Sequence, residues 1–248
     1  IILVCDPDAD RMGVGVKHDG EYMLLTGNQS GSVLIEYIFS QMKAQHKMPA
    51  HPVMFNTVVT SDLGEKIANK YGVECEKTLT GFKFIGEKVA KYEKTGEKQY
   101  VFGYEESYGS LIRPFVRDKD APQACLMLAE AACYYKQQGK DLVDVLYGLY
   151  EELGYYEESQ KSLTLAGKEG AEKIQSILSG LRNTQLEAIA DLAVIRFEDY
   201  KEAVVIENGK KAKLTGFTSS DVLKYYLEDG SWIAIRPSGT EPKCKFYY

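Results

Sequence analysis

The sequence predicts an α/β protein: a mixed, mostly parallel sheet domain covered by helices, followed by a smaller α+β domain. Between residues 27 and 154, apolar runs with strand character alternate with helical runs. This order is typical of a parallel sheet that is covered on both faces. After Gly154, strand-like runs follow one another with one helix among them. The composition, 44% hydrophobic and 27% charged, is that of a globular chain.

The first 26 residues contain three strand-like runs and are interpreted as the end of a preceding domain. Residues 1–5 are apolar and lead into an acidic loop. Residues 12–17 alternate as a strand, and a turn at His18-Asp19-Gly20 precedes a further strand at 21–25.

Residues 27–154 are expected to form the α/β domain. Asp62 and Glu65 resemble a capping box, Gly139 is a typical helix stop, and Asp141 is a typical helix start. With the hydrophobic periodicity, these signals predict helices at 33–42, 62–70, 82–92, 122–138 and 142–153, and strands at 53–59 and 100–102.

Residues 155–248 are expected to form the smaller α+β domain, with the boundary at 153–158. The predicted elements are a helix at 167–181 and strands at 155–163, 191–197, 203–207, 212–217 and 231–236. The chain opens and stops inside strand-like runs, Ile1 to Cys5 and Cys244 to Tyr248. Because termini usually lie outside packed strands, we expect a fragment of a longer protein.

The bulk properties argue against several function classes. With a net charge of −6, the chain is expected to bind neither nucleic acid nor an anionic membrane. No apolar run approaches the roughly 20 residues of a membrane helix, and no signal peptide is recognisable. Five cysteines without a C-x-x-C pair favour reduced thiols in a cytoplasmic protein. The three histidines, His18, His46 and His51, show no partner pattern and are interpreted as surface or packing residues.

The loop Asp6-Pro7-Asp8-Ala9-Asp10-Arg11 carries three carboxylates at alternate positions. Alternate side chains of an extended backbone point the same way, and clustered carboxylates suit a hard cation such as Mg²⁺ or Ca²⁺. An EF-hand is excluded, because Arg11 and Lys17 stand where that loop needs glycine and glutamate. A solvated acidic turn or a helix N-cap cluster is the structural alternative. Arg11 could help to hold a phosphate beside a metal.

The loop Gly103-Tyr104-Glu105-Glu106-Ser107-Tyr108-Gly109 follows a predicted strand. Ligands of α/β sheets bind beyond the carboxyl ends of the strands. Glu105 and Ser107 lie two residues apart, so that an acceptor and a donor could face the hydroxyls of one sugar. The alternative is a polar surface loop packed on its tyrosines.

The loop from Arg236 to Lys243 also follows a strand. Arg236 can clasp phosphate oxygens, Ser238 and Thr240 offer hydroxyl donors, and Gly239 permits close approach. The spacing of a Walker P-loop is absent. The alternative is a proline-bounded surface turn.

Two further segments carry weaker signals. Thr80-Gly81-Phe82-Lys83 could be a hinge loop that places Lys83 at a ligand, or the start of a helix with a solvated lysine. The run from Arg117 to Asp120 could form an ordinary solvated face.

Taken together and in this order, these motifs resemble those of the α-D-phosphohexomutase family, which includes phosphoglucomutases and phosphomannomutases. The resemblance implies Mg²⁺ on Asp6, Asp8 and Asp10, with Arg11 and Lys119 as catalytic residues. It implies a hexose phosphate substrate whose sugar hydroxyls bind Glu105 and Ser107. The remaining implied substrate contacts are Thr80, Gly81 and Lys83 for sugar orientation, and Arg236, Ser238, Gly239 and Thr240 for the non-reacting phosphate.

The resemblance also implies a reaction. A phosphoserine would exchange its phosphoryl group with hexose 1-phosphate or 6-phosphate through a bisphosphate intermediate, with glucose preferred on the pattern of the Glu105 loop. The family's serine stretch, similar to T-A-S-H-N-P, has no match here. We therefore expect an inactive fragment whose partner is the N-terminal domains of the same protein. A non-catalytic sugar-phosphate-binding module and a scaffold stabilised by Mg²⁺ or Ca²⁺ are the alternatives.

Overall fold

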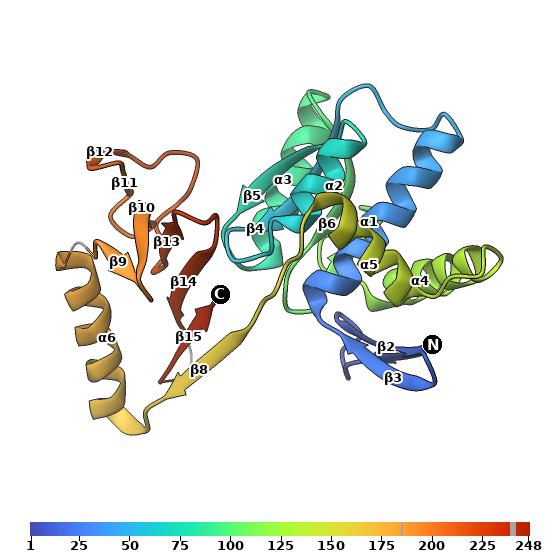
Figure 1. Ribbon diagram of the computed structural model, residues 1–248. Helices are drawn as coiled ribbons and strands as arrows, with labels where there is room; N and C mark the ends of the chain where they lie inside the picture. The colour runs from blue at the N-terminus through green and yellow to red at the C-terminus, as the bar shows by residue number, and fades with distance from the viewer. Residues whose placement is uncertain (185, 239–241) are drawn as a thin grey trace. The chain divides into compact units, whose positions relative to one another are not determined.

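The chain divides into two compact units, Ile1–Tyr156 and Glu157–Tyr248. The computed structural model describes residues 1–184, 186–238 and 242–248 (Figure 1). The first unit joins a small antiparallel sheet to a helix-covered, mostly parallel sheet, and the second is an antiparallel sheet with one long helix. The predicted fold class is therefore confirmed.

The first unit opens with a sheet of strand order β1-β2-β3, in which all neighbours are antiparallel. Its strands are β1 (Ile2–Cys5), β2 (Met12–His18) and β3 (Glu21–Leu25). Met12, Val14 and Val16 alternate along β2 and are buried in the main hydrophobic core, because every second side chain of a strand faces the same side. This sheet is thereby fixed to the helices that follow it.

The second sheet of this unit has the strand order β5-β4-β6-β7. β5 and β6 both run parallel to β4, whereas β7 pairs antiparallel with β6. The strands are β4 (Pro52–Thr57), β5 (Glu74–Thr78), β6 (Gln99–Tyr104) and β7 (Ser110–Leu111). The helices are α1 (Gly27–Ala44), α2 (Leu63–Lys70), α3 (Phe82–Thr95), α4 (Ala121–Lys136) and α5 (Leu142–Leu153).

Helices cover both faces of this sheet. Val53 and Phe55 of β4 pack with α3 on one face. Met54 of β4 and Phe102 of β6 pack on the other face, in the core built by α1, α2, α4 and α5. Burial on both faces explains why the central strands are apolar at nearly every position. Their carboxyl ends lead to the loops from which the candidate site is built.

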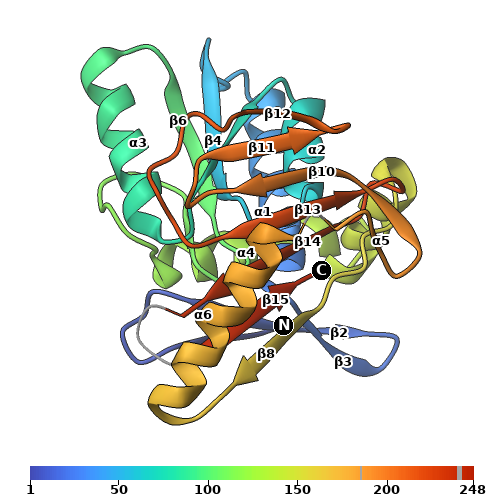
Figure 2. The same cartoon turned by 90° about the vertical axis from the view of Figure 1, so that its left-hand side faces the viewer.

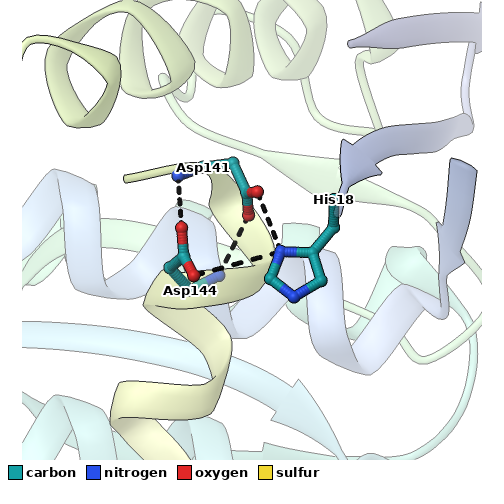
Figure 3. A group of neighbouring side chains, drawn as sticks. All are labelled: His18, Asp141 and Asp144. Carbon is teal, nitrogen blue, oxygen red and sulfur yellow. Dashed lines mark hydrogen bonds and ion pairs between the residues drawn. The ribbon is translucent and has the colours of Figure 1, made fainter. Parts of the chain in front are cut away.

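His18 connects the small sheet to the start of α5. Its Nδ1 lies 2.9 Å from Oδ2 of Asp141, the N-cap residue of α5 (Figure 3). Asp141 and Asp144 also exchange capping-box hydrogen bonds with each other's backbone N–H groups. These bonds already occupy both carboxylates, so the group holds the helix end and anchors the sheet. His18 is thus a partner of two acidic residues, which the sequence did not reveal.

The second unit contains an antiparallel sheet of strand order β12-β11-β10-β13-β14-β15-β8, with the short β9 paired to β10. Helix α6 (Gly167–Asn183) lies across one face, where Ile174 and Leu178 join the buried side chains of the sheet (Figure 2). The strands are β8 (Gln160–Thr164), β9 (Ala188–Ile189), β10 (Leu192–Asp199), β11 (Val204–Glu207), β12 (Lys210–Lys213), β13 (Leu223–Leu227), β14 (Trp232–Pro237) and β15 (Lys243–Tyr247).

Several predicted elements need correction. The capping box at Asp62 is wrong: Asp62 makes no capping bond, and its carboxylate accepts from Lys77 instead. Helix α1 begins at Gly27 rather than Val33, capped by Thr26. The strand predicted at 155–163 begins at Gln160, and the strand predicted at 212–217 is the β12 hairpin arm at 210–213. Strands β5 and β13 were missed.

No helix within the described residues is long and apolar enough to cross a membrane.

Candidate functional site

The acidic loop is a closed turn between two paired strands. The N–H of Asp6 donates to the carbonyl of Arg11 (3.3 Å), and the N–H of Ala9 donates to the carbonyl of Asp6 (3.0 Å). Ala9 has φ of 55°, a left-handed conformation that tightens the turn. Because the loop joins β1 to β2, the alternative of a helix N-cap cluster is wrong.

The three carboxylates of this loop converge. One oxygen of each of Asp6, Asp8 and Asp10 lies within 4.8 Å of the others. Oδ1 of Asp6 accepts from the N–H groups of Arg11 (3.0 Å) and Asp10 (3.1 Å). The bond from Arg11 is the main cause that holds the pKa of Asp6 below its ordinary value.

Asp10 supplies the observation that best fits a cation. Its Oδ1 is buried and accepts no hydrogen bond from any described residue. A buried carboxylate oxygen without a donor is costly, and a hard cation bound by oxygen ligands would satisfy it. Asp8, in contrast, is exposed. The donor set therefore fits a divalent hard cation.

Lys119 connects the acidic loop to the other motifs of this unit. Its side chain is only 10% exposed, and its Nζ lies 2.9 Å from Oδ2 of Asp10 and 2.8 Å from Oδ1 of Asp118. Burial alone would lower the pKa of Lys119, but the bonds to Asp118 and Asp10 raise it above its ordinary value. The reading of residues 117–120 as a solvated face is therefore wrong for Lys119, although Asp118 is mostly exposed.

The position of Lys119 depends on two other loops. A Cβ on Gly109 would lie 2.1 Å from Cδ of Lys119, so the lysine stem crosses the glycine at the end of the Glu105 loop. Its Nζ also lies 5.7 Å from the centre of the Phe82 ring, in the Thr80–Lys83 segment. Lys119 stands just before α4, whose N-cap Asp120 donates its N–H to the carbonyl of Ser110. Four separate motifs thus meet along the side chain of Lys119.

The Glu105 loop is held from two sides. Glu105 is buried, and its Oε1 accepts a 2.7 Å hydrogen bond from the N–H of Gly81, where φ is 114°. On the other side, Arg11 and Gly109 form an antiparallel β-bridge, and the N–H of Met12 donates to the carbonyl of Tyr108 (3.2 Å). The acidic loop and the Glu105 loop are therefore hydrogen-bonded neighbours.

Glu106 has a role that sequence reasoning missed. Its Oε2 accepts from the hydroxyls of Thr57 (3.3 Å) and Thr60 (3.4 Å), where β4 ends. These bonds tie the loop after β6 to the loop after β4. The adjacency of two strand ends in a parallel sheet was the only available signal, since neither threonine belongs to a recognised motif.

The remaining predicted residues of the first unit take less constrained positions. Ser107 and Thr80 are half-buried, and Lys83 is exposed. The Nζ of Lys83 lies 4.8 Å from the centre of the neighbouring Phe84 ring. The described contacts therefore do not join Lys83 to Lys119 or to its partners Asp10 and Asp118.

The predicted phosphate loop begins in the last residues of β14 and ends at the start of β15, in the second unit. Arg236 pairs with Lys245 in the strand register, and the N–H of Ser238 donates to the carbonyl of Lys243 (2.7 Å). Both Arg236 and Ser238 are half-buried. Gly239 and Thr240 lie outside the described residues.

Comparisons with known proteins match both units. The model of the phosphoglucomutase/phosphomannomutase α/β/α domain III matches residues 26–153, and that of the family's C-terminal domain matches residues 182–248. A phosphoglucomutase of Staphylococcus saprophyticus is 35% identical over 251 residues, covering 100% of this chain and 45% of the relative. A phosphoglucomutase of Staphylococcus aureus is 36% identical over 249 residues, with 100% and 44% covered. The chain thus spans less than half the length of these relatives.

Solved structures show the same fold. The open form of parafusin, a phosphoglucomutase from Paramecium, superposes with a TM-score of 0.65 at 21% identity, covering 99% of this chain and 40% of that one. A phosphoglucomutase/phosphomannomutase family protein from Burkholderia thailandensis gives a TM-score of 0.57 at 16% identity, with 99% and 41% covered. The domain III match alone includes more than half of the sequence. This chain belongs to the phosphoglucomutase/phosphomannomutase family.

Proposed function

We propose that the whole protein interconverts hexose 1-phosphate and hexose 6-phosphate, with glucose preferred, through a phosphoserine and a bisphosphate intermediate. Family membership supports this proposal, as do relatives that are named phosphoglucomutases and are about twice as long. In this proposal, residues 1–26 end the second domain, 27–154 form the third and 155–248 belong to the fourth. The reactive serine and the N-terminal domains lie outside this chain.

Asp6, Asp8 and Asp10 are proposed to hold Mg²⁺. The observation that carries this assignment is the convergence of the three carboxylates, one of which, Asp10, has a buried Oδ1 that accepts no hydrogen bond from a described residue. When bound, Mg²⁺ would supply positive charge beside the phosphoryl oxygens. Phosphoryl transfer depends more on such charge neutralisation than on covalent catalysis by the protein. The N–H groups of Asp10 and Arg11 donate to Oδ1 of Asp6 and would hold this carboxylate in place before an ion binds.

Lys119 and Arg11 are proposed as the cations that hold the transferring phosphoryl group beside the acidic loop. Lys119 stays protonated because its pKa is raised, so it supplies charge rather than accepting a proton. Arg11 is exposed and lies 3.7 Å from Oδ1 of Asp10, which leaves its guanidinium within reach of an incoming anion.

The sugar and its second phosphate are assigned to the other loops. Glu105 would accept from a sugar hydroxyl while Ser107 donates to its neighbour, and Thr80, Gly81 and Lys83 would respond to the orientation of the ring. The hydrogen bond from the N–H of Gly81 to Glu105 supports a shared role for the Thr80–Lys83 segment and the Glu105 loop. Arg236, Ser238, Gly239 and Thr240 would bind the non-reacting phosphate.

Calorimetric titration of the 248-residue chain with Mg²⁺ tests the metal assignment. Asp8→Asn removes one ligand charge from an exposed side chain, so we expect binding to weaken about tenfold or more without loss of the fold. Asp19→Asn, at the exposed β2–β3 turn, removes the same charge from the same sheet and should leave Mg²⁺ binding unchanged. Equal affinity of the Asp8 variant and the unaltered chain would reject the site.

A coupled glucose 1-phosphate assay tests whether turnover requires the part of the protein that lies outside this chain. The isolated chain should show no turnover, because the phosphoserine lies elsewhere, while the whole protein should be active. Turnover by the isolated chain would overturn the placement of the serine. An inactive whole protein that still binds glucose 1-phosphate would favour a non-catalytic binding module.

A further inference from the structure

Two cysteines meet beside the acidic loop. The Sγ of Cys5, the last residue of β1, lies 3.5 Å from the Sγ of Cys125 on α4. The two residues are 120 positions apart in the sequence, so the contact is produced by the fold alone. Both are free thiols, Cys5 exposed and Cys125 half-buried.

The two sulfur atoms are in contact and lie within a short approach of bonding distance. A covalent S–S bond is about 2.05 Å long, so the sulfurs need to approach by about 1.5 Å. Among the described residues β1 pairs only with β2 and is the edge strand of its sheet, so one side of its backbone is not held by a neighbouring strand. Leu3, two residues earlier on the same face of β1, already packs against the core to which Cys125 belongs.

The cysteine pair lies at the start of the acidic loop. Cys5 directly precedes Asp6, and the loop is held to the start of α4 at two further points. The N–H of Ala121 donates to the carbonyl of Ala9 (3.0 Å), and Lys119 pairs with Asp10. A covalent link between Cys5 and Cys125 would add a third connection, at the stem of the loop.

We propose that Cys5 and Cys125 are a redox modification site that forms a reversible intramolecular disulfide and ties the acidic loop to α4. The oxidant is a low-molecular-weight disulfide, represented by oxidised glutathione. The Cys5 thiolate attacks one glutathione sulfur, the glutathione S–S bond breaks, and glutathione leaves as a thiolate. The Cys125 thiolate then attacks the Cys5 sulfur and releases the second glutathione. Two protein thiols are oxidised, and one glutathione disulfide is reduced to two thiols.

The remaining cysteines provide the control. Cys133 is exposed on α4, eight residues after Cys125 and therefore about 12 Å further along the helix. It should react with oxidised glutathione only to form a mixed disulfide. Cys244 in β15 is buried, whereas Cys75 in β5 is half-buried and burial raises the pKa of its thiol.

The test is to incubate the folded 248-residue chain with oxidised glutathione, alkylate the remaining thiols, and map the peptides by mass spectrometry. We expect a linked Cys5–Cys125 peptide without glutathione, and dithiothreitol should return both thiols. Cys133→Ser should form the same link. Cys125→Ser should lose it and carry glutathione on Cys5. The midpoint of thermal unfolding should rise by several degrees on oxidation in the unaltered chain and in Cys133→Ser only.

The peptide map distinguishes the proposed disulfide from other thiol reactions, and no outcome depends on Mg²⁺ binding or on catalysis. Separate glutathione adducts on Cys5 and Cys125 would overturn the proposal, as would two unreacted thiols in a sample whose Cys133 is modified. If Cys125→Ser does not fold, Cys5→Ser replaces it, since its exposed position tolerates serine. A link that survives in either variant would be assigned to another pair and would also overturn the proposal.

Discussion

The carboxylate of Glu105 accepts a 2.7 Å hydrogen bond from the backbone N–H of Gly81, which joins the loop after β6 to the loop before α3. The acceptor is buried, and the donor belongs to a glycine with positive φ. A side chain of one loop thus fixes the backbone of another. The bond is the most direct link between the two segments assigned to sugar recognition.

Glu105→Ala is expected to destabilise the chain by about 1.5–3 kcal/mol, because the partly buried N–H of Gly81 loses a charged acceptor. Glu105→Gln retains a neutral acceptor and should recover part of this loss. Chemical denaturation gives both free energies of unfolding. Glu87→Ala, an exposed glutamate on α3, is the control and should change the free energy little. Equal stability of Glu105→Ala and Glu87→Ala would contradict the structural role.

Lys119→Met should tighten Mg²⁺ binding by the 248-residue chain about three- to tenfold. The ammonium group competes with a metal for the Asp10 carboxylate, and its removal recovers roughly 1 kcal/mol of partly screened Coulomb energy. The methionine keeps an apolar stem over Gly109. Calorimetry provides the measurement, with Lys119→Arg as the charge-retaining control. Weaker Mg²⁺ binding by the methionine variant would show that the lysine positions the loop instead.

Gly27→Ala should cost about 1–3 kcal/mol of stability, because its Cβ would lie 2.1 Å from the carbonyl oxygen of Glu106. Gly148→Ala is the matched control: it lies in α5 with open space around its Cβ position. That change should stabilise the chain by up to about 1 kcal/mol, because alanine is the better helix former. Urea denaturation of both variants should therefore move the midpoints in opposite directions.

The pair of His18 and Asp141 predicts a pH-dependent stability. The bond to Asp141 raises the pKa of His18, with Asp19 and Asp144 adding to the effect. The contribution of His18 to the stability of the fold is therefore complete below the unfolded-state pKa of about 6.5 and is lost as the pH rises through the raised pKa of the folded state. Burial raises the pKa of Asp141, but the imidazole of His18 and the N–H groups of Val143 and Asp144 together lower it below its ordinary value. The contribution of Asp141 to stability is therefore lost only as the pH falls through this lowered pKa.

His18→Gln should consequently lower the thermal midpoint more at about pH 5.5 than at about pH 8.5. The edge of the Tyr147 ring also packs on the imidazole, with centroids 5.7 Å apart, so some loss is expected at both values. His51→Gln, which alters an exposed histidine, is the control. A loss that is the same at both pH values would assign His18 to packing alone.

Arg236→Ala combined with Ser238→Ala should weaken binding of glucose 1-phosphate by the chain, since each charge-assisted hydrogen bond is worth about 1.5–3 kcal/mol. Arg236 lies in β14, and Ser238 directly follows that strand. Calorimetry compares this variant with Lys211→Ala, which removes a positive charge from the exposed strand β12. Unchanged binding in the double variant would reject the phosphate assignment.

Much of the fold could be predicted because its signals are local. Asp141 begins α5 with a capping box, and the apolar β4 and β6 are flanked by turn residues. Strand β5 was missed because Glu74, Glu76 and Lys77 give it a polar sequence, which an edge strand tolerates. In β13, Lys224 interrupts the apolar pattern but is buried beside Trp232, 3.9 Å from its ring centre.

The candidate site could be predicted as separate loops but not as an arrangement. Asp6, Asp8 and Asp10 lie close in sequence, so their convergence follows from the loop itself. The place of Lys119 depends on Gly109 and Phe82, which come from different segments, and nothing in the charge run identifies it as the buried member. The same limit applies to Cys5 and Cys125, whose contact exists only because α4 packs beside β1.

The β-bridge between Arg11 and Gly109 restricts how these two loops can diverge in sequence. One extra or missing residue in either loop would shift the register of the bridge, and with it the bond from Met12 to Tyr108. Substitutions can therefore accumulate in either loop, whereas insertions and deletions should be excluded from both. The lengths of the two loops are therefore coupled, although Arg11 and Tyr108 lie 97 positions apart along the chain.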